Sequence, residues 1–423
     1  MKTLTSRERL ITTLNHRQPD RVCVDFGGTG VTGIHASIVH QLKQRLIGPS
    51  AAIARVHEPY QMLAEVDAEL RAALGLDVIG IWGRKNMFGY EAGGWKPFTL
   101  FDGTPCLVPG RFNVTPAPDG GWLMYPEGDT SLSPSGHMPK GAYFFDTIIR
   151  QDPIDEDHLN PEDNLEEFGL FAAEDIAYYQ NQAAWLDQNA RDTGVILPAP
   201  GAAFGDIAFV PAPFLRHPKG IRDISEWYMA TAARPDYVHA VFEKQCEYAL
   251  KNLETLIGIF GDRVQAVFTT GTDFGTQNSL FISLESYRNL FKPYHRRLND
   301  LIHRKSNWKT FIHSCGAVAP LIPEFIEAGF DILNPVQCSA AGMDAVQLKR
   351  NFGRDIAFWG GCVNTQHTMY QTPEAVYREV RERIDLFNQD GGYVCNAVHN
   401  VQGNSPIENV LAMFKAIHDS SRS

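Results

Sequence analysis

Eight short apolar runs, separated by longer amphipathic stretches, constrain the fold of this 423-residue chain more than any other feature. Most of the runs are continuously hydrophobic, as strands are when both faces of a parallel sheet are covered. The predicted strands are residues 21–26, 77–82, 194–199, 264–270, 309–314, 331–336, 356–361 and 392–397. The clearest predicted helices are residues 285–305, 318–328, 344–352 and 373–388.

This alternation predicts the α/β class, and eight strands with intervening helices favour a single TIM-type (β/α)8 barrel over residues 1–423. A doubly wound open sheet is the alternative, because periodicity alone does not separate an open parallel sheet from a closed one. The last four strands follow one another at short, even intervals, which favours the barrel.

Residues 84–150 interrupt the alternation with many glycines and prolines. Two hairpin signals, FDGT at 101–104 and PDGG at 118–121, lie between alternating apolar positions. We therefore expect a β-rich insertion after the second strand. A loop in that position lies at the C-terminal mouth of a barrel, where barrel enzymes keep their chemistry.

The overall charge excludes several classes of partner. A net charge of −11 and a pI near 5.7 argue against nucleic-acid binding and against binding to anionic membranes, since both need a basic face. The charged N-terminus has no apolar signal core, and no run approaches the length of a membrane span, so we expect a cytoplasmic protein. Seven scattered cysteines do not resemble a disulfide framework, which leaves core thiols, nucleophiles or metal ligands.

Two metal-capable side chains end the fifth predicted strand. His313 and Cys315 are two positions apart, and in a strand such positions face the same way. Histidine and thiolate suit zinc, and a catalytic zinc has three protein ligands and one open position. The third ligand would come from another strand, and spacing leaves three candidates: Cys338, Cys362 and Cys395. The alternative is that these thiols are small buried hydrophobic groups.

Other polar residues follow the same strand ends. Asp273 could accept a proton, orient a substrate or support a metal ligand, or it could simply cap a turn. His399, in the loop before the last helix, is either catalytic or structural. Five neutral side chains are candidates for binding a substrate or corrinoid: Gln277, Gln337, Asn364, Gln366 and Asn396. The Gly-rich residues 25–35 lack the spacings of nucleotide-binding loops, so we expect only a loop at the mouth.

Several stretches, in order along nearly the whole chain, resemble the uroporphyrinogen decarboxylase superfamily and its cobalamin-linked methyltransferase branch. They are NHRQPDRVCVDFGG (15–28), GLDVIGI (75–81), MPKGAYFFD (138–146), TDFGTQNSLFISLESYRNLFKPYH (272–295), HSCGAVAPLIPEFIEAGFDILNPVQ (313–337), FWGGCVNTQ (358–366) and GGYVCNAVHNVQGNSPIENV (391–410). The resemblance implies a TIM-type barrel, a possible homodimer, and a zinc site formed by His313, Cys315 and Cys395. Cys362 stands where many relatives have glycine, which makes it a rival or additional ligand.

The resemblance further implies a zinc-dependent methyltransferase. It would move a methyl group between a small methylated substrate (an aryl methyl ether, a methylated amine or a thiol) and the cobalt of a corrinoid. The chain lacks the DxHxxG cobalamin-binding signature, so we expect the corrinoid on a partner protein that docks at the mouth.

Three alternatives remain open from the sequence. The resemblance implies that a true decarboxylase binds its porphyrinogen acid with an arginine-rich motif after the first strand. The equivalent residues 25–35 contain no arginine to supply these counter-charges. A non-catalytic carrier would bind corrinoid or metal without turnover. A zinc hydrolase would need Asp273 or His399 as a general base, and the chain has no HExxH motif.

Overall fold

Each of the eight predicted apolar runs contains one strand of a parallel sheet in the computed structural model, which describes residues 3–421. The order in the sheet is β1-β16-β15-β14-β13-β12-β11-β4. The end strands meet where the backbone N–H of Asp77 donates to the carbonyl of Val24 (2.8 Å). The predicted TIM-type barrel is therefore confirmed. The strands are β1 (Cys23–Val24), β4 (Val78–Gly80), β11 (Gly194–Pro198), β12 (Ala266–Thr270), β13 (Lys309–His313), β14 (Ile332–Asn334), β15 (Ala357–Trp359) and β16 (Tyr393–Cys395).

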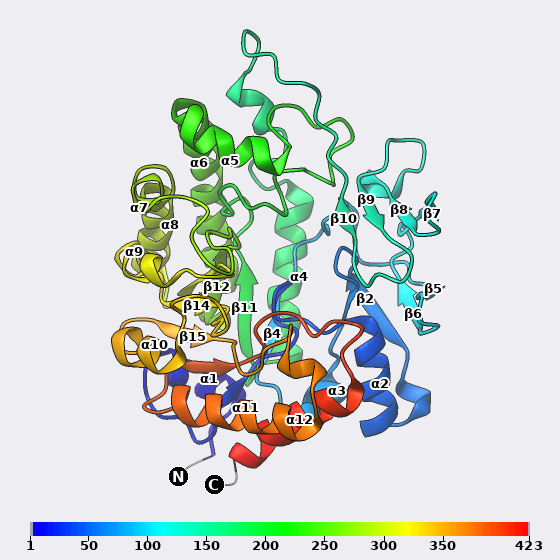
Figure 1. Cartoon of the computed structure of the whole chain (residues 1–423), viewed down its shortest axis with the longest axis vertical. Helices are drawn as coiled ribbons and strands as arrows, with labels where there is room; N and C mark the ends of the chain where they lie inside the picture. The colour runs from blue at the N-terminus through cyan, green and yellow to red at the C-terminus, as the bar shows by residue number, and fades with distance from the viewer. Residues whose placement is uncertain (1–2, 422–423) are drawn as a thin grey trace.

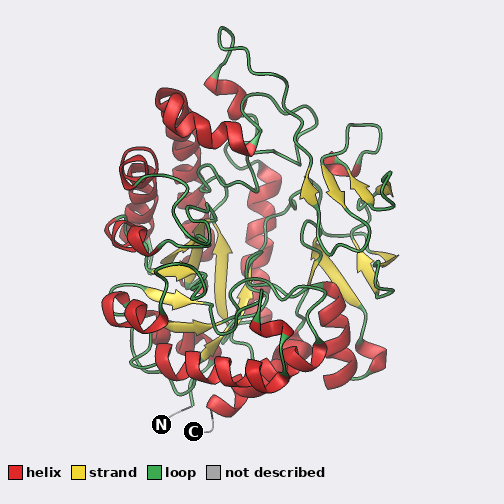
Figure 2. Ribbon diagram, viewed as in Figure 1, coloured by secondary structure: helices red, strands yellow, loops and turns green. Residues whose placement is uncertain are grey.

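Helices surround the barrel strands (Figures 1 and 2). They are α1 (Ser6–Leu14), α2 (Ala36–Leu46), α3 (Ala68–Leu74), α4 (Ala173–Asn189), α5 (Ile224–Ala233), α6 (Pro235–Phe260), α7 (Leu284–Ser286), α8 (Lys292–Lys305), α9 (Ile322–Glu327), α10 (Ala345–Phe352), α11 (Pro373–Phe387) and α12 (Ile407–Ser420). Among the described residues, no helix combines the length and the apolar character that a membrane crossing requires.

The predicted helix at 285–305 is interrupted by one wider turn. Helix α7 continues into a π-type turn over Tyr287–Phe291, and α8 follows. Pro293 explains the widening, because it has no N–H to donate and its ring would clash with the carbonyl four residues earlier.

Alternate strand residues fill the barrel interior. Phe311, Ile332, Ala357 and Val394 form one buried cluster with Leu10 and Leu14 of α1. Helix α1 therefore closes the end of the barrel where the strands begin, at the bottom of Figure 1, while the arrow of β11 points toward the opposite end. The chemistry-bearing residues after β12, β13 and β16 lie at that opposite, C-terminal end.

A buried carboxylate joins α1 to the start of β4. Asp77 is fully buried and accepts hydrogen bonds from Arg9 (2.7 Å), Arg21 (2.8 Å) and the backbone N–H of Val24 (3.0 Å). It therefore compensates the charge of Arg9, which is itself only 4% exposed.

We expect Asp77→Ala to lower the free energy of unfolding by about 3–5 kcal/mol, because it removes the only fully buried carboxylate that pairs with Arg9 and leaves that arginine with Asp20 alone. Urea denaturation followed by circular dichroism measures this loss. Asp187→Ala is the control, since Asp187 pairs with Arg263 at the surface and its loss should cost little. If Asp77→Ala lowered the free energy of unfolding as little as Asp187→Ala, Asp77 would not be the residue that fastens α1 to the start of β4.

The residues between β4 and α4 form a β-rich region beside the barrel, at the right of Figure 2. Both hairpin signals lie in turns: FDGT joins β5 to β6, and PDGG joins β7 to β8. The two sheets have the orders β10-β9-β8-β7 and β3-β2-β6-β5. Strands β2 and β3, which precede β4, were not among the predicted strands. The bounds are β2 (Ala54–Glu58), β3 (Leu63–Ala64), β5 (Lys96–Thr99), β6 (Pro105–Val108), β7 (Val114–Pro116), β8 (Trp122–Met124), β9 (Gly136–Met138) and β10 (Asp146–Thr147).

Candidate active site

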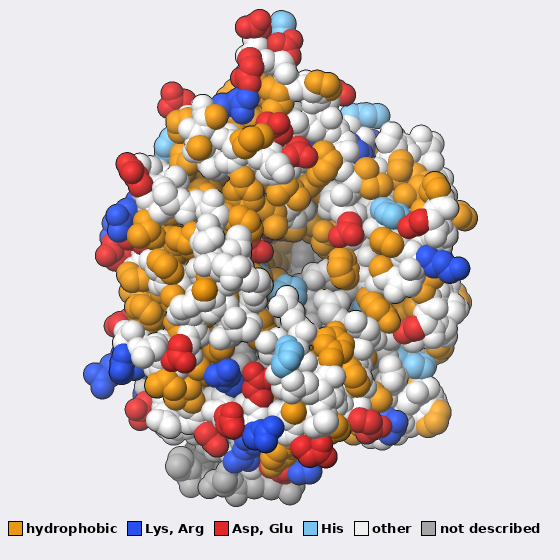
Figure 3. Space-filling view, viewed as in Figure 1, with side chains coloured by type: hydrophobic (Ala, Val, Ile, Leu, Met, Phe, Trp, Pro, Cys, Tyr) orange, Lys and Arg blue, Asp and Glu red, His pale blue; other side chains and the backbone are white. Residues whose placement is uncertain are grey.

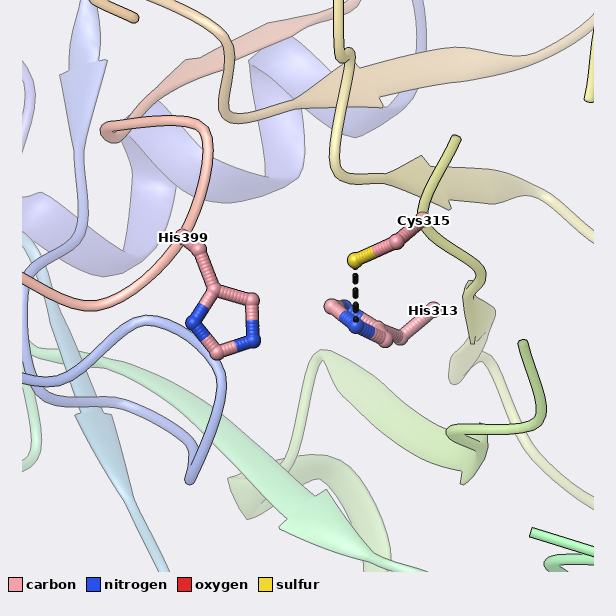
Figure 4. Close-up of side chains that lie close together, drawn as sticks. All are labelled: His313, Cys315 and His399. Atoms are coloured by element: carbon pink, nitrogen blue, oxygen red, sulfur yellow. Dashed lines mark hydrogen bonds between the residues drawn. The ribbon is translucent and has the colours of Figure 1, made fainter. Parts of the chain in front are cut away.

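Three metal-capable side chains converge at the C-terminal end of the barrel: His313, Cys315 and His399. Each offers a ligand atom, and these atoms all lie within 4.8 Å of one another (Figure 4). The Sγ atom of Cys315 is 3.3 Å from Nε2 of His313. His313 ends β13 with the same strand parity as the interior residue Phe311, so its ring faces the barrel axis.

Asn334, at the end of β14, determines which nitrogen of His313 is free. Its side-chain N–H group donates to the carbonyl of Trp359 (2.8 Å), which turns its Oδ1 toward Nδ1 of His313 (2.5 Å). Nδ1 therefore carries the proton and donates it to Asn334. Nε2 keeps its lone pair and faces Cys315, as a metal-binding histidine requires.

His399 enters the group from a loop that is tied to the loop after β1. Asn400 accepts a hydrogen bond from the backbone N–H of Gly33 and donates to the carbonyl of Gly30. The His399 ring lies 5.4 Å from the His313 ring, at 74° to it. Among the described residues, no hydrogen-bond partner engages the His399 ring, so both of its nitrogens remain available as ligands.

Asp273, in the loop after β12, fixes the backbone of the thiol-bearing turn. Its Oδ1 accepts the backbone N–H of Cys315 (2.7 Å) and lies 3.9 Å from Nε2 of His313. Burial raises the pKa of this carboxyl. Asp273 therefore positions Cys315 and adds a carboxylate beside the three donors.

The protonation states of the two histidines suit metal binding. Burial lowers the pKa of His313 and of His399 to about 4, so both rings are neutral near pH 7. Burial also raises the pKa of the Cys315 thiol well above its usual range, and the nearby Asp273 carboxyl raises it further. Two imidazoles and one thiol, with partial exposure at Cys315 and His399, match the three-ligand donor set of a catalytic zinc.

Comparison with known proteins now defines the family. The uroporphyrinogen decarboxylase (URO-D) family model matches residues 206–420, about half of the chain. The chain belongs to the uroporphyrinogen decarboxylase family. The matched region includes β12 to β16, all three metal-capable side chains and Asp273, so the resemblance read from the sequence is confirmed at the level of the family.

Both methyltransferases and decarboxylases occur among the similar proteins. A methylated-thiol–coenzyme M methyltransferase of Methanosarcina mazei is 24% identical over 222 residues, 51% of this chain and 53% of the relative. A uroporphyrinogen decarboxylase of Mannheimia succiniciproducens is 24% identical over 197 residues, 45% of this chain and 50% of the relative. The chain thus spans about half the length of the curated relatives it matches.

A solved methyltransferase from Methanosarcina mazei has the same fold. It superposes with a TM-score of 0.53 at 14% identity, covering 98% of this chain and 99% of that one. At this identity the likeness concerns the fold alone.

In this member of the family, Cys395 does not join the metal-capable group, contrary to the expected third ligand. Val394 faces the barrel interior, so the next residue on β16 faces the helices outside. Tyr393, which shares that outer face, stacks on Phe387 of α11 with ring centroids 5.3 Å apart. Cys395 is fully buried on the same side. His399, four residues later, takes the third position instead.

The other two candidate thiols also lie apart from the group. Cys362 is fully buried, and burial together with a hydrogen bond to Cys395 raises the pKa of its thiol. Cys338 is partly exposed in the loop after β14, and burial raises the pKa of its thiol to about 11. Neither is among the three side chains whose ligand atoms converge.

Two of the predicted binding amides brace the thiol-bearing turn. Gln337 accepts the backbone N–H of Gly316 (2.8 Å) and donates to Oε1 of Gln277 (2.8 Å). Gly316 has φ +88°, and a side chain there would meet the backbone of Gly275 within 2.5 Å. The two glutamines therefore support a turn that only glycine can form, and a contact with substrate remains a prediction.

The three remaining amides lie around the rim or below it. Asn364 accepts the backbone N–H groups of Gln366 and His367, and Gln366 is exposed. Asn396 is fully buried and donates to the carbonyl of Asp25, which fastens β16 to the loop after β1. The binding roles of these three side chains remain predictions.

Sequence reasoning missed Asn334 and Asp206. Asn334 could have been identified from its parity with the interior residue Ile332, since a polar side chain facing a barrel axis needs a partner. Asp206 follows β11 at the same end of the barrel and is 6% exposed.

The molecular surface has a hollow near the centre of the face shown in Figure 3. Apolar side chains border it, and a histidine lies at its lower edge.

We expect Asn334→Ala to weaken zinc binding by about 10–100-fold, because His313 loses the acceptor that fixes its tautomer. Competition with a chromophoric chelator measures the affinity. Asn299→Ala is the control, since Asn299 is equally buried and donates to a backbone carbonyl far from the site. Equal zinc affinity in the two variants would contradict the assigned role of Asn334.

Proposed function

We propose that the chain is a zinc-dependent methyltransferase that moves a methyl group from a small methylated substrate to the cobalt of a corrinoid carried by a partner protein. The convergence of His313, Cys315 and His399 supports this proposal more than any other observation. The methyltransferase relative from Methanosarcina mazei supports the reaction class.

Zinc bound by these three side chains would act as a Lewis acid on the heteroatom that carries the methyl group. The chain's own residues prepare that site before substrate arrives. Asn334 orients His313, Asp273 holds the Cys315 backbone, and Asn400 fastens the loop that carries His399. The partial exposure of Cys315 and His399 leaves the group accessible from the mouth.

The absence of a cobalamin-binding signature supports delivery of the corrinoid by a separate protein. The partner would approach the open C-terminal end, because α1 blocks the other end of the barrel. The insertion beside the barrel offers additional surface for that contact.

The charges at the mouth argue against the decarboxylase alternative. Asp206 and Asp273 both lie at this end, and no Lys or Arg of the described chain forms an ion pair or hydrogen bond with either. A substrate that carries several carboxylates would find no counter-charge beside these two carboxyl groups, and burying its charges without one is costly. A small uncharged or cationic methyl donor fits this environment better.

The test combines metal analysis with single-turnover methyl transfer. Zinc-loaded protein is mixed with cob(I)alamin and a panel of methyl ethers, methylated amines and thioethers, and methylcobalamin is followed by its absorbance. The expected result is about one zinc per chain and methylcobalamin from at least one donor. Carbon dioxide release from a porphyrinogen without zinc, and no methylcobalamin from any donor, would refute the proposal.

A further inference from the structure

Asp206 is a buried carboxyl group at the rim that the proposed mechanism does not use. It lies in the loop after β11, and its Oδ1 accepts the backbone N–H of Ala208 (2.9 Å). Its backbone carbonyl accepts the N–H groups of Phe209 and Val210. These bonds complete a turn. They leave Oδ2 without a protein donor among the residues that the structure describes.

The free oxygen lies over the loop that carries Asp273. A Cβ atom placed on Gly271 would be 2.7 Å from Oδ2 of Asp206, and Gly271 is two residues before Asp273. The hydroxyl of Thr272 donates to the carbonyl of Phe204 (2.7 Å), which joins the two loops. Asp273 in turn holds Cys315, so Asp206 lies on the strand end next to the one that supports the metal-capable group.

The surroundings favour the protonated form of this carboxyl. Its charge interacts with that of Asp273 in the loop after β12, and with the hydroxyl groups of Tyr228 in α5 and Tyr60 in the loop after β2. No described Lys or Arg is paired with it. Burial, and secondarily the charge of Asp273, raises the pKa of Asp206 to about 7. A group with this pKa holds a transferable proton at neutral pH.

We infer that Asp206 is the acid that protonates the atom from which the methyl group departs, and that the donor therefore carries its methyl group on oxygen. This inference rests on the proposed methyltransferase function. A phenol-type oxygen has a pKa of about 10 and a thiol of about 8.5, so a departing oxygen gains more from a proton than a departing sulfur does. A quaternary nitrogen would leave as a neutral amine without one.

The step balances as follows. The cobalt(I) lone pair forms the C–Co bond, the C–O bond breaks and both of its electrons stay on oxygen. The carboxylic proton of Asp206 moves to that oxygen. The products are methyl-cobalt(III), a neutral alcohol or phenol, and the Asp206 carboxylate, which regains a proton from water.

Asp206→Asn tests this role with little risk to the fold, because asparagine keeps the Oδ1 acceptor for Ala208. Zinc-loaded wild type and variant each react with cob(I)alamin and either anisole or 4-nitroanisole. We expect the variant to be slower by about 10²–10⁴-fold with anisole, as for loss of a general acid. The expected change with 4-nitroanisole is small, because nitrophenolate leaves without a proton. The wild-type rate with anisole should fall as the pH rises above about 7, and the variant should not show this fall.

Glu58→Gln is the matched control. Burial raises the pKa of Glu58 to about 7 as well, but both of its oxygens already accept the backbone N–H groups of Tyr60 and Gln61. The ratio of the anisole rate to the 4-nitroanisole rate should be unchanged in this variant. An equal loss with both ethers in Asp206→Asn would overturn the inference, since a structural defect has that pattern. Transfer by wild type from thioethers alone would also overturn it and leave the methyltransferase proposal intact. No methylcobalamin from any donor with wild type would refute both.

Discussion

Replacing Cys315 with serine should weaken zinc binding by more than about 100-fold. Mutations of residues that only hydrogen-bond to a metal ligand typically cost about 10–100-fold. Cys315 provides the only thiol within the metal-capable group, and serine is a much poorer ligand for zinc. Its backbone N–H still donates to Asp273 in the variant, so the turn should persist. Methyl transfer should fall in proportion to the zinc that is lost.

The measurement is zinc affinity by chelator competition, together with the metal content after dialysis. Cys338→Ser is the matched control, because Cys338 is also a partly exposed thiol in a loop after a neighbouring strand. Its zinc affinity should equal that of wild type. A Cys315→Ser protein that retains about one zinc per chain would contradict the assignment of this ligand.

The second large effect should separate His399 from Cys395. We expect His399→Ala to lose more than about 100-fold in zinc affinity, because its imidazole is the third donor and neither of its nitrogens is otherwise engaged. Cys395→Ala should leave zinc affinity unchanged, since the Cys395 side chain is buried on the outer face of β16. It should instead lower stability by about 1 kcal/mol, the cost of a small cavity.

Zinc titration and urea denaturation of both variants separate these effects. The prediction is a change in affinity without a large change in stability for His399→Ala, and the opposite for Cys395→Ala. If Cys395→Ala lost zinc and His399→Ala retained it, the ligand set originally expected from the sequence would be restored.

Hydrophobic patterning predicted the eight barrel strands well, because a strand that is buried on both faces is a nearly continuous run of apolar residues. The same patterning did not predict β2 and β3. Strand β2 pairs with β6, where Ala54 lies opposite Cys106, and β3 in turn pairs with β2. The pairing of β2 depends on a partner strand far along the chain rather than on local composition. The wide turn before α8 could have been anticipated from Pro293, whose effect on the helix is local.

The sequence alone predicted that His313 and Cys315 lie together, from the rule that two positions along a strand share a face. In the structure Cys315 lies just beyond the end of β13, and its Sγ is 3.3 Å from Nε2 of His313. The sequence did not predict the third member of the metal-capable group. Whether Cys395 or His399 reaches the pair depends on the face that β16 turns to the barrel axis. It also depends on the loop that Asn400 ties to Gly30 and Gly33.

The sequence by itself determined the succession of the strands along the chain and the end of the barrel at which polar residues gather. It also determined that two metal-capable side chains, His313 and Cys315, follow one another at one strand end. The tertiary structure decided which distant side chain completes the group and which amides, such as Gln337, support it. The physical reason is that the alternation of side chains along a strand depends only on the local backbone, so it can be read from neighbouring residues. The meeting of Gly33 with Asn400 is set by closure of the barrel, which no local pattern encodes.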